Sequence, residues 1–180
     1  RKYIEMTRSG MEVFDPTQTL VMLDKASDFL KEIAKKDGLI LLVGTTPAAK
    51  DLIKSLGDKF GLPYVTNRWL GGTLTNRKTL SERLQHYMNL KADRETGKLE
   101  KYTKKERIKF DKEIGRLTQL FSGLEKYARL PEALLVVDST EHDTAVKEAR
   151  RLKIPVVALI NSNANPITID YVIPCNNGAR

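Results

Sequence analysis

The sequence predicts an α/β fold, a doubly wound parallel five-stranded sheet of the flavodoxin or Rossmann type that carries an inserted antiparallel coiled-coil helical hairpin. Three observations support it. Short apolar runs alternate with amphipathic helical patterns, which is typical of parallel sheets. The runs are apolar throughout, as in strands that are covered on both faces. Between the two halves of this pattern, residues 77–129 show helical periodicity and little strand character.

The first half of the chain predicts two strands of the sheet, each preceded or followed by a helix. Residues 2–14 alternate loosely and predict a small hairpin or an extended arm. Asp15-Pro16-Thr17 predicts a helix start, because proline suits the first turn and a polar side chain caps it. The remaining predicted elements are this first helix as far as Gly38, a strand at 39–43, a helix at 47–56 and a short strand at 63–65.

The second half repeats the alternation and supplies three more strands. Ser139 and Thr140 are expected to cap its helix, since hydroxyl side chains accept from free N–H groups. Strands and helices in this sequence predict the strand order two-one-three-four-five. The predicted elements are a strand at 133–138, a helix at 141–152, a strand at 154–160 and a last short strand at 171–173.

A heptad seam predicts the inserted hairpin. Apolar residues recur at alternating spacings of four and three, which places them on one narrow stripe that packs against another helix. The predicted turn lies at residues 93–98. We therefore expect a discontinuous α/β domain at 1–76 and 130–180, with the basic helical hairpin at 77–129. The seam residues are Phe110, Ile114, Leu117, Phe121, Leu124 and Ala128, and a similar stripe upstream consists of Leu80, Leu84, Tyr87 and Leu90.

Positive charge is concentrated in the predicted hairpin. The chain has a formal net charge of +8, and residues 76–129 contain 15 Lys and Arg against 8 Asp and Glu. A local excess of this kind indicates a surface for a polyanion, although a solvated charged helical pair has the same composition. The single cysteine excludes an internal disulfide and a cysteine-rich zinc site. No apolar run approaches the roughly 20 residues that span a bilayer.

The segment Asn67–Asn76 contains the only tryptophan and a paired glycine. Gly71-Gly72 permits a tight turn or a close backbone approach. Arg68 and Trp69 together offer a guanidinium and an aromatic plane, which suit RNA. The alternative is a loop with a buried tryptophan and a surface arginine, and Trp69 is expected to be such an anchor.

Two other segments are candidates for a catalytic or cofactor site. Gly44-Thr45-Thr46 follows a strand and precedes a helix, where anions bind in doubly wound folds. It lacks both the dinucleotide fingerprint and the P-loop pattern. Asp138 and His142 lie near each other in the sequence, but helix capping explains the acidic residues around them. We expect no enzyme activity, no cofactor and no metal.

Four segments together resemble the family of small-subunit ribosomal protein two. The most specific is Asn67-Arg68-Trp69-Leu70-Gly71-Gly72-Thr73-Leu74-Thr75-Asn76, and the others lie at 130–138, 145–149 and 154–158. The resemblance extends over nearly the whole chain in the same order. It implies a Rossmann-like domain with an inserted coiled-coil hairpin and a structural role in the small ribosomal subunit.

The resemblance also implies partners. They are ribosomal RNA near the junction of head and body, and neighbouring small-subunit proteins, including in bacteria the large mRNA-binding protein one. It implies no membrane and no small-molecule substrate, and a place in cytoplasmic or organellar ribosomes. The family usually has an acidic residue at the position of Asn161 and often at Asn165, and its acidic ending is replaced here around Asn177. No acid-dependent contact is expected at these amides.

Our hypothesis is that exposed cations of the loop and hairpin neutralise RNA phosphates while the seam stiffens the hairpin. Asn67 and Asn76 are expected to bond either RNA sugars or the backbone of the loop. The two alternatives are a nucleotide- or phosphate-binding enzyme at Gly44-Thr45 and a coiled-coil scaffold that binds no RNA. The candidate RNA-binding residues are Asn67, Arg68, Asn76, Arg77, Lys78, Lys104, Lys105, Arg107, Lys109 and Arg116.

Overall fold

Five parallel strands form the central sheet of the computed structural model. The structure describes residues 4–8 and 11–176, and for residues 5–8 and 11–13 it describes the backbone alone. The sheet order is β4-β3-β5-β6-β7, which is two-one-three-four-five when its strands are numbered along the chain. The predicted fold class and strand order are therefore confirmed. The strands are β3 (Ile40–Val43), β4 (Tyr64–Val65), β5 (Ala133–Val137), β6 (Val156–Ile160) and β7 (Tyr171–Pro174).

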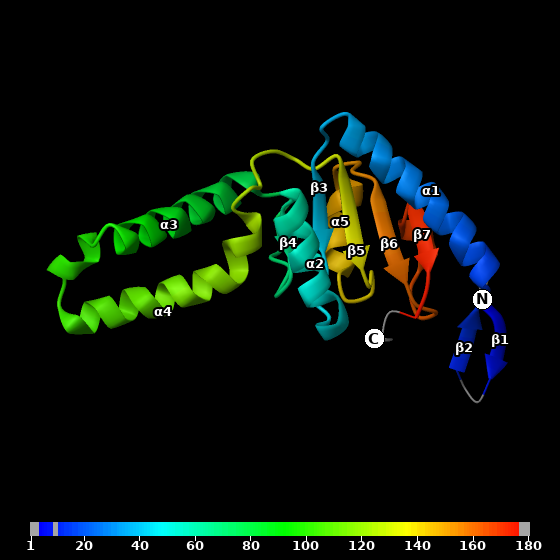
Figure 1. Ribbon diagram of the computed structural model, residues 1–180, viewed down its shortest axis with the longest axis horizontal. Coiled ribbons are helices and arrows are strands. Elements are labelled where there is room, and N and C mark those ends of the chain that lie inside the picture. The colour runs from blue at the N-terminus through cyan, green and yellow to red at the C-terminus, as the bar shows by residue number, and fades with distance from the viewer. Residues whose placement is uncertain (1–3, 9–10, 177–180) are drawn as a thin grey trace.

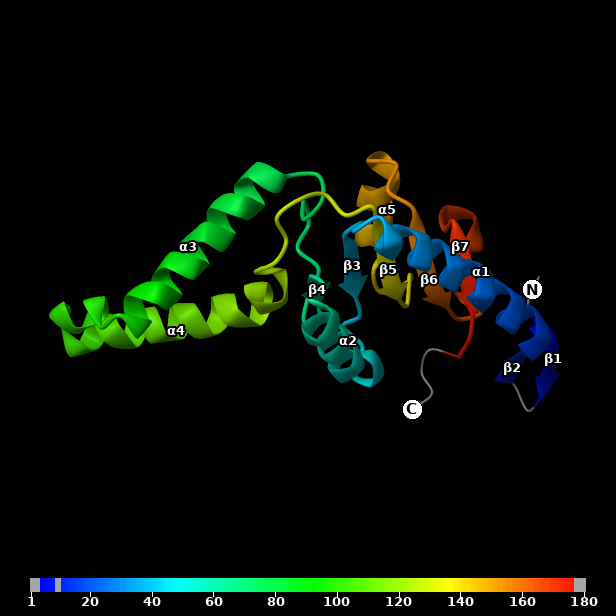
Figure 2. The same cartoon turned by 45° about the horizontal axis from the view of Figure 1, so that its top comes forward.

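Helices cover both faces of the sheet (Figures 1 and 2). α1 (Pro16–Lys35) and α2 (Pro47–Phe60) share one face, because Leu30 of α1 and Ile53 of α2 pack in the same cluster. α5 (Asp143–Arg151) lies on the other face. No helix in the described part of the chain is long and apolar enough to cross a membrane.

An antiparallel hairpin of β1 (Ile4–Arg8) and β2 (Met11–Phe14) precedes α1, which is the first of the two predicted alternatives, a hairpin or an extended arm. Ser9 and Gly10, between the two strands, lie outside the described residues. Asp15 caps α1 by accepting the N–H groups of Thr17 and Gln18. α1 ends at Lys35, three residues before the expected end at Gly38.

The start of α5 differs from the prediction. α5 begins at Asp143 and its N-cap, His142, makes no side-chain capping bond. The preceding turn is held by Asp138, whose carboxylate accepts the N–H groups of Thr140 and Glu141. The predicted capping role of Ser139 and Thr140 is therefore wrong, because a longer-reaching carboxylate on the strand end accepts these donors first.

Two long helices, α3 (Arg77–Glu95) and α4 (Lys104–Phe121), form a hairpin that extends away from the sheet (Figure 1). The turn between them contains the 3₁₀ segment η1 (Lys98–Lys101), and Thr103 and Glu106 begin α4 with a capping box. The predicted seam is buried at Leu80, Tyr87 and Leu90 in α3, and at Ile114, Leu117 and Phe121 in α4.

The helical seam ends earlier than the spacing predicts. Leu124 lies in the 3₁₀ segment η2 (Ser122–Leu124) and Ala128 is exposed beyond it. η2 packs against the edge strand β4. A Cβ built on Gly123 would lie 2.2 Å from the carbonyl oxygen of Tyr64. Glycine at this position thus lets the root of the hairpin contact the sheet directly.

A buried carboxylate in α5 holds the loop between β4 and α3. Glu148 is 8% exposed, and its two oxygens accept hydrogen bonds from five donors of the described loop. Gly72 adopts a φ of +89°, a conformation that favours glycine, and so turns its N–H toward the carboxylate. The donors and distances are Trp69 Nε1 (3.1 Å), Gly72 N (2.8 Å), Leu74 N (3.0 Å), Thr75 N (3.2 Å) and Thr75 Oγ1 (3.2 Å).

The ionised form of Glu148 is the stable one in the folded protein. Burial by itself would raise the pKa of this carboxyl, but hydrogen bonds from Gly72, Trp69 and the following backbone lower it below its ordinary value. The Glu148 carboxylate therefore replaces, inside the protein, the water that the loop donors would otherwise bind. Trp69 is 9% exposed, which confirms its expected role as an anchor.

Replacing this carboxylate should destabilise the fold. Glu148→Gln keeps the shape but removes the charge and turns an acceptor into a donor, which leaves buried loop N–H groups without a partner. We expect the free energy of unfolding to fall by about 2–3 kcal/mol, measured by urea denaturation at pH 7. Glu32→Gln, at an exposed position of α1, is the control. Equal stability of the two variants would contradict the assigned role.

The stabilising effect of Glu148 should depend on pH. Because its folded pKa lies below the ordinary value of 4.5, its contribution is present above that pH and is lost as the pH falls through the lowered pKa. The difference in unfolding free energy between the wild type and Glu148→Gln should therefore shrink below about pH 4.5. Denaturation curves from pH 7 to pH 3 test this, and a constant difference would show that the charge is unimportant.

Candidate nucleic-acid interface

Three of the candidate loop residues lie at the surface where β4 leads into the hairpin. All three, Asn67, Arg68 and Asn76, are exposed. The Asn67 side-chain amide donates to the carbonyl of Gln119 in the last turn of α4. The expected partners of Asn67 are an RNA sugar or the loop's own backbone, and the carbonyl of Gln119 is neither of these. Through this bond, Asn67 joins the loop to the hairpin.

Arg77 begins α3 and is only half-exposed. Its guanidinium donates to the carbonyl of Ala128, 3.0 Å away, in the segment that returns from the hairpin to β5. Its Nε is buried and has no hydrogen-bond partner among the described residues. Lys78, the next residue, is exposed. The structure thus gives Arg77 a role in closing the root of the hairpin and leaves Lys78 facing solvent.

The candidate cations of α4 are all exposed. Within the described part of the chain, none of them has a carboxylate oxygen within 4.0 Å of its charged nitrogen atoms. Their charge is therefore directed to solvent or to a partner. These residues are Lys104, Lys105, Arg107, Lys109 and Arg116.

Two cations of α3, Lys91 and Arg94, are paired with carboxylates. Lys91 lies 3.1 Å from a carboxylate oxygen of Glu125, and Arg94 lies 3.8 Å from Asp111 of α4. The hydrogen bond and the charge of Glu125 raise the pKa of Lys91. Exposed pairs of this kind add little stability. They leave Lys78 and Arg83 as the exposed cations of α3 without a carboxylate partner among the described residues, whereas all six cations of α4 are of this kind.

Four cations of α4 form one stripe along its outer face. Lys105, Lys109, Lys112 and Arg116 follow one another at spacings of four, three and four. The seam residues of α4, from Phe110 to Phe121, show the same spacing, shifted by five residues. At 100° per residue this shift places the stripe on the side of α4 away from its buried face. Lys112 is absent from the predicted site, although the spacing identifies it.

The loop and the stripe are neighbours in space. The bond from Asn67 to the carbonyl of Gln119 brings the start of the loop to the turn of α4 that follows Arg116. Arg68, next to Asn67, therefore lies close to the sheet-proximal end of the stripe. The fold thus brings the loop that contains Arg68 to the sheet-proximal end of the stripe, and the stripe extends along α4 as far as Lys105.

The strand end at Gly44-Thr45, the alternative site considered for an enzyme, is held by contacts that serve the fold. His142 is buried, and its Nε2 lies 3.4 Å from both the N and Oγ1 of Thr45. Burial lowers the pKa of His142, although the nearby Asp138 and Glu141 carboxylates oppose this effect. No group of three or more His, Cys, Asp or Glu among the described residues has metal-binding geometry. His142 therefore links the turns after β3 and β5.

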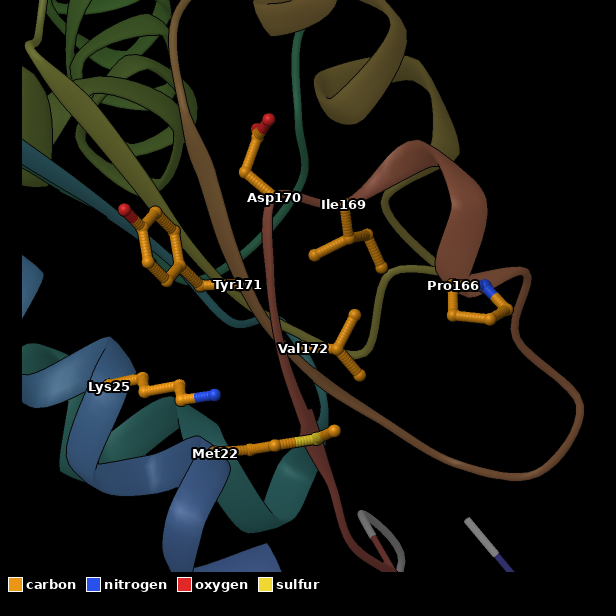
Figure 3. A pocket seen from close by; sticks show the side chains of 7 residues that line it. All are labelled: Met22, Lys25, Pro166, Ile169, Asp170, Tyr171 and Val172. Atoms are coloured by element: carbon orange, nitrogen blue, oxygen red, sulfur yellow. The ribbon is translucent and has the colours of Figure 1, made fainter. Parts of the chain in front are cut away.

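A hollow of about 230 Å³ lies between α1 and the start of β7 (Figure 3). Lys25 and Asp170 are the charged members of its lining, and the Asp170 carboxylate already accepts the N–H of Val156 at 2.8 Å. The other residues that line it are Met22, Pro166, Ile169, Tyr171 and Val172. This lining lacks a nucleophile with an adjacent base, and nothing in it assembles a catalytic site.

The amides that depart from the family pattern act as turn acceptors. The side-chain oxygen of Asn161 accepts the N–H of Ser162, and that of Asn165 accepts the N–H of Ile167. An aspartate would accept the same bonds, so neither turn requires a charge. The third amide, Asn177, lies outside the described residues.

Comparison with known proteins agrees with this architecture. The family model described as ribosomal protein S2 matches residues 1–180. Small ribosomal subunit protein uS2 of Thermus thermophilus is 39% identical over 178 residues, which cover 99% of this chain and 70% of that protein. The Roseiflexus castenholzii protein of the same name is 41% identical, with 99% and 68% covered. The Ureaplasma urealyticum protein is 42% identical, with 97% and 50% covered.

These similarities extend from one end of the chain to the other and include both the sheet and the hairpin. The chain therefore belongs to the ribosomal protein S2 family and is a structural, non-enzymatic constituent of the small ribosomal subunit.

Proposed function

We propose that the cationic surface formed by Arg68 and the outer stripe of α4 binds the phosphate backbone of small-subunit ribosomal RNA. The stripe comprises Lys105, Lys109, Lys112 and Arg116. The observation that carries the proposal is the stripe itself, since four exposed cations follow one another along one face of α4 and none has a carboxylate partner among the described residues, whereas Lys91 and Arg94 of α3 are paired. Unpaired cations along a rigid helix bind RNA by neutralising phosphates and releasing counterions.

The remaining candidate residues divide into two groups. Lys78, Lys104, Arg107 and Asn76 are exposed outside the stripe and are further candidates for contact with RNA. Asn67 and Arg77 bond the carbonyls of Gln119 and Ala128 and act by positioning the loop and the hairpin. In this proposal residues 1–76 and 130–180 form the sheet domain, and residues 77–129 form an RNA-binding arm.

Neutralising the stripe should weaken RNA binding without unfolding the protein. The variant Lys105→Gln/Lys109→Gln/Lys112→Gln removes three positive charges at exposed positions. We expect its dissociation constant for small-subunit ribosomal RNA to rise on the order of tenfold, and the slope of log K against log salt to fall by about 2–3. Filter binding at several salt concentrations measures both quantities.

The matched control is Lys91→Gln/Arg94→Gln/Lys98→Gln, which removes the same charge from the acid-paired side of the hairpin. If both triple variants bind RNA equally well, the outer stripe has no special role. If RNA crosslinks are absent from both the loop and α4, the hairpin is a scaffold for proteins and the proposal is wrong. Circular dichroism confirms that each variant remains helical.

We also propose that the chain contacts neighbouring small-subunit proteins and, in a bacterial ribosome, the large mRNA-binding protein one. This rests on the family resemblance and on the similarity to bacterial relatives. Small subunits assembled without this chain should retain less protein one than complete subunits, as quantified by sedimentation and immunoblotting. Equal retention would exclude a direct role in holding protein one.

A further inference from the structure

A second group of cations lies at the edge of the sheet where its parallel strands begin. Arg150 and Arg151 end α5, and Lys153 precedes β6, so all three lie at this amino-terminal edge, uppermost in Figure 1. All three side chains are exposed. As far as the structure describes the chain, none has a carboxylate oxygen within 4.0 Å, whereas Lys147 one turn earlier is paired with Asp143.

The surface at this edge is concave. A hollow of about 240 Å³ is lined by Arg150, Lys153, Ile154, Pro155 and Asp170. Asp170 is the acidic member of the lining, and one of its oxygens accepts the N–H of Val156 at 2.8 Å. Two unpaired cations and one engaged carboxylate leave the hollow with an excess of positive charge.

Lys153 occupies the backbone position that closes α5, where a glycine would stabilise the helix end better. Its N–H donates to the carbonyl of Arg150 (3.0 Å), and the N–H of Ile154 donates to that of Ala149 (2.9 Å), which together form a Schellman motif. Lys153 occupies the left-handed position of the motif, with a φ of +57°, where glycine is strongly preferred. α2 places Gly61 at its own left-handed end, with a φ of +69°.

Attraction between cations and the helix C-terminus accounts for Arg150 and Arg151, which lie in the last turn of α5. It does not require a lysine at a position that strains the backbone, because a glycine in place of Lys153 would close the helix better. Asp37 closes α1 in the same left-handed conformation, with a φ of +55°, so the proposal rests on the unpaired cations and the hollow. Two unpaired cations in the lining of a hollow, Arg150 and Lys153, with Arg151 next in the chain, have the chemistry that recognises a phosphate group.

We propose that Arg150, Arg151 and Lys153 form a second binding surface for the phosphate backbone of ribosomal RNA, separate from α4. The proposal takes its RNA partner from the proposed function but uses different residues in the sheet domain. The hairpin leaves the sheet from the side of β4, whereas this surface lies beside β6, beyond β3 and β5 in the strand order. The chain would then contact RNA at two points, which fixes its orientation as well as its position.

Lys153→Gly separates this proposal from folding. The substitution removes one positive charge and the backbone strain together, so the melting temperature should stay the same or rise by about 2 °C. We expect RNA affinity to fall about threefold to fivefold, and the slope of log K against log salt to fall by about 1. The probe is transcribed small-subunit ribosomal RNA. The control, Lys54→Gln, removes one exposed charge from α2, on the other face of the sheet.

The double variant Arg150→Gln/Arg151→Gln should weaken binding further in the same assay. Loss of affinity in Lys153→Gly and in the double variant, with Lys54→Gln unchanged, supports the second surface. Unchanged affinity in Lys153→Gly and the double variant overturns it. The triple variant of the α4 stripe distinguishes the two proposals, because it tests the hairpin alone and its result does not depend on this edge of the sheet.

Discussion

The arrangement of this protein depends on one buried carboxylate. Glu148 lies on α5, at the back of the sheet, yet its oxygens bind the loop that connects β4 to the hairpin. The tryptophan, the glycine turn and the start of α3 are thereby fixed relative to the sheet. A charged group is costly to bury unless it is fully hydrogen-bonded, and five loop donors meet that condition here. The loop is shaped around the carboxylate, and the direction in which the hairpin leaves the sheet follows from it.

The hairpin continues the core of the sheet. Tyr87, Phe121 and Leu124 belong to the same hydrophobic cluster as Leu41 and Leu134 of the central strands. Its root is therefore held by packing, while its outer part projects into solvent with a stiff seam (Figure 1). Its charges differ between the helices as well, since Lys91 and Arg94 of α3 are paired with acids, whereas the stripe on α4 is unpaired within the described residues. A rigid arm with one cationic face suits a structural constituent of a ribonucleoprotein, where position matters more than turnover.

Much of the fold follows from local patterns. Continuous apolar runs such as 39–43 and 133–138 identify buried parallel strands, and the alternation with helices yields the strand order that the structure confirms. The heptad spacing from Phe110 to Phe121 identifies the hairpin. The spacing fails at Ala128, because apolar periodicity cannot show where a helix gives way to a 3₁₀ turn. The capping prediction fails for Ser139, since a nearby aspartate competes for the same donors.

The sequence by itself determined the elements, their order, the cationic character of the hairpin and the family, since each of these depends on residues close together in the chain. Only the tertiary structure decided which charges remain unpaired and which polar groups hold the loop. Glu148 lies 76 residues from Gly72, and Asn67 lies 52 residues from Gln119. Partners so far apart leave no periodic trace in a single sequence. Their contacts arise when the sheet brings α5, the loop and α4 together.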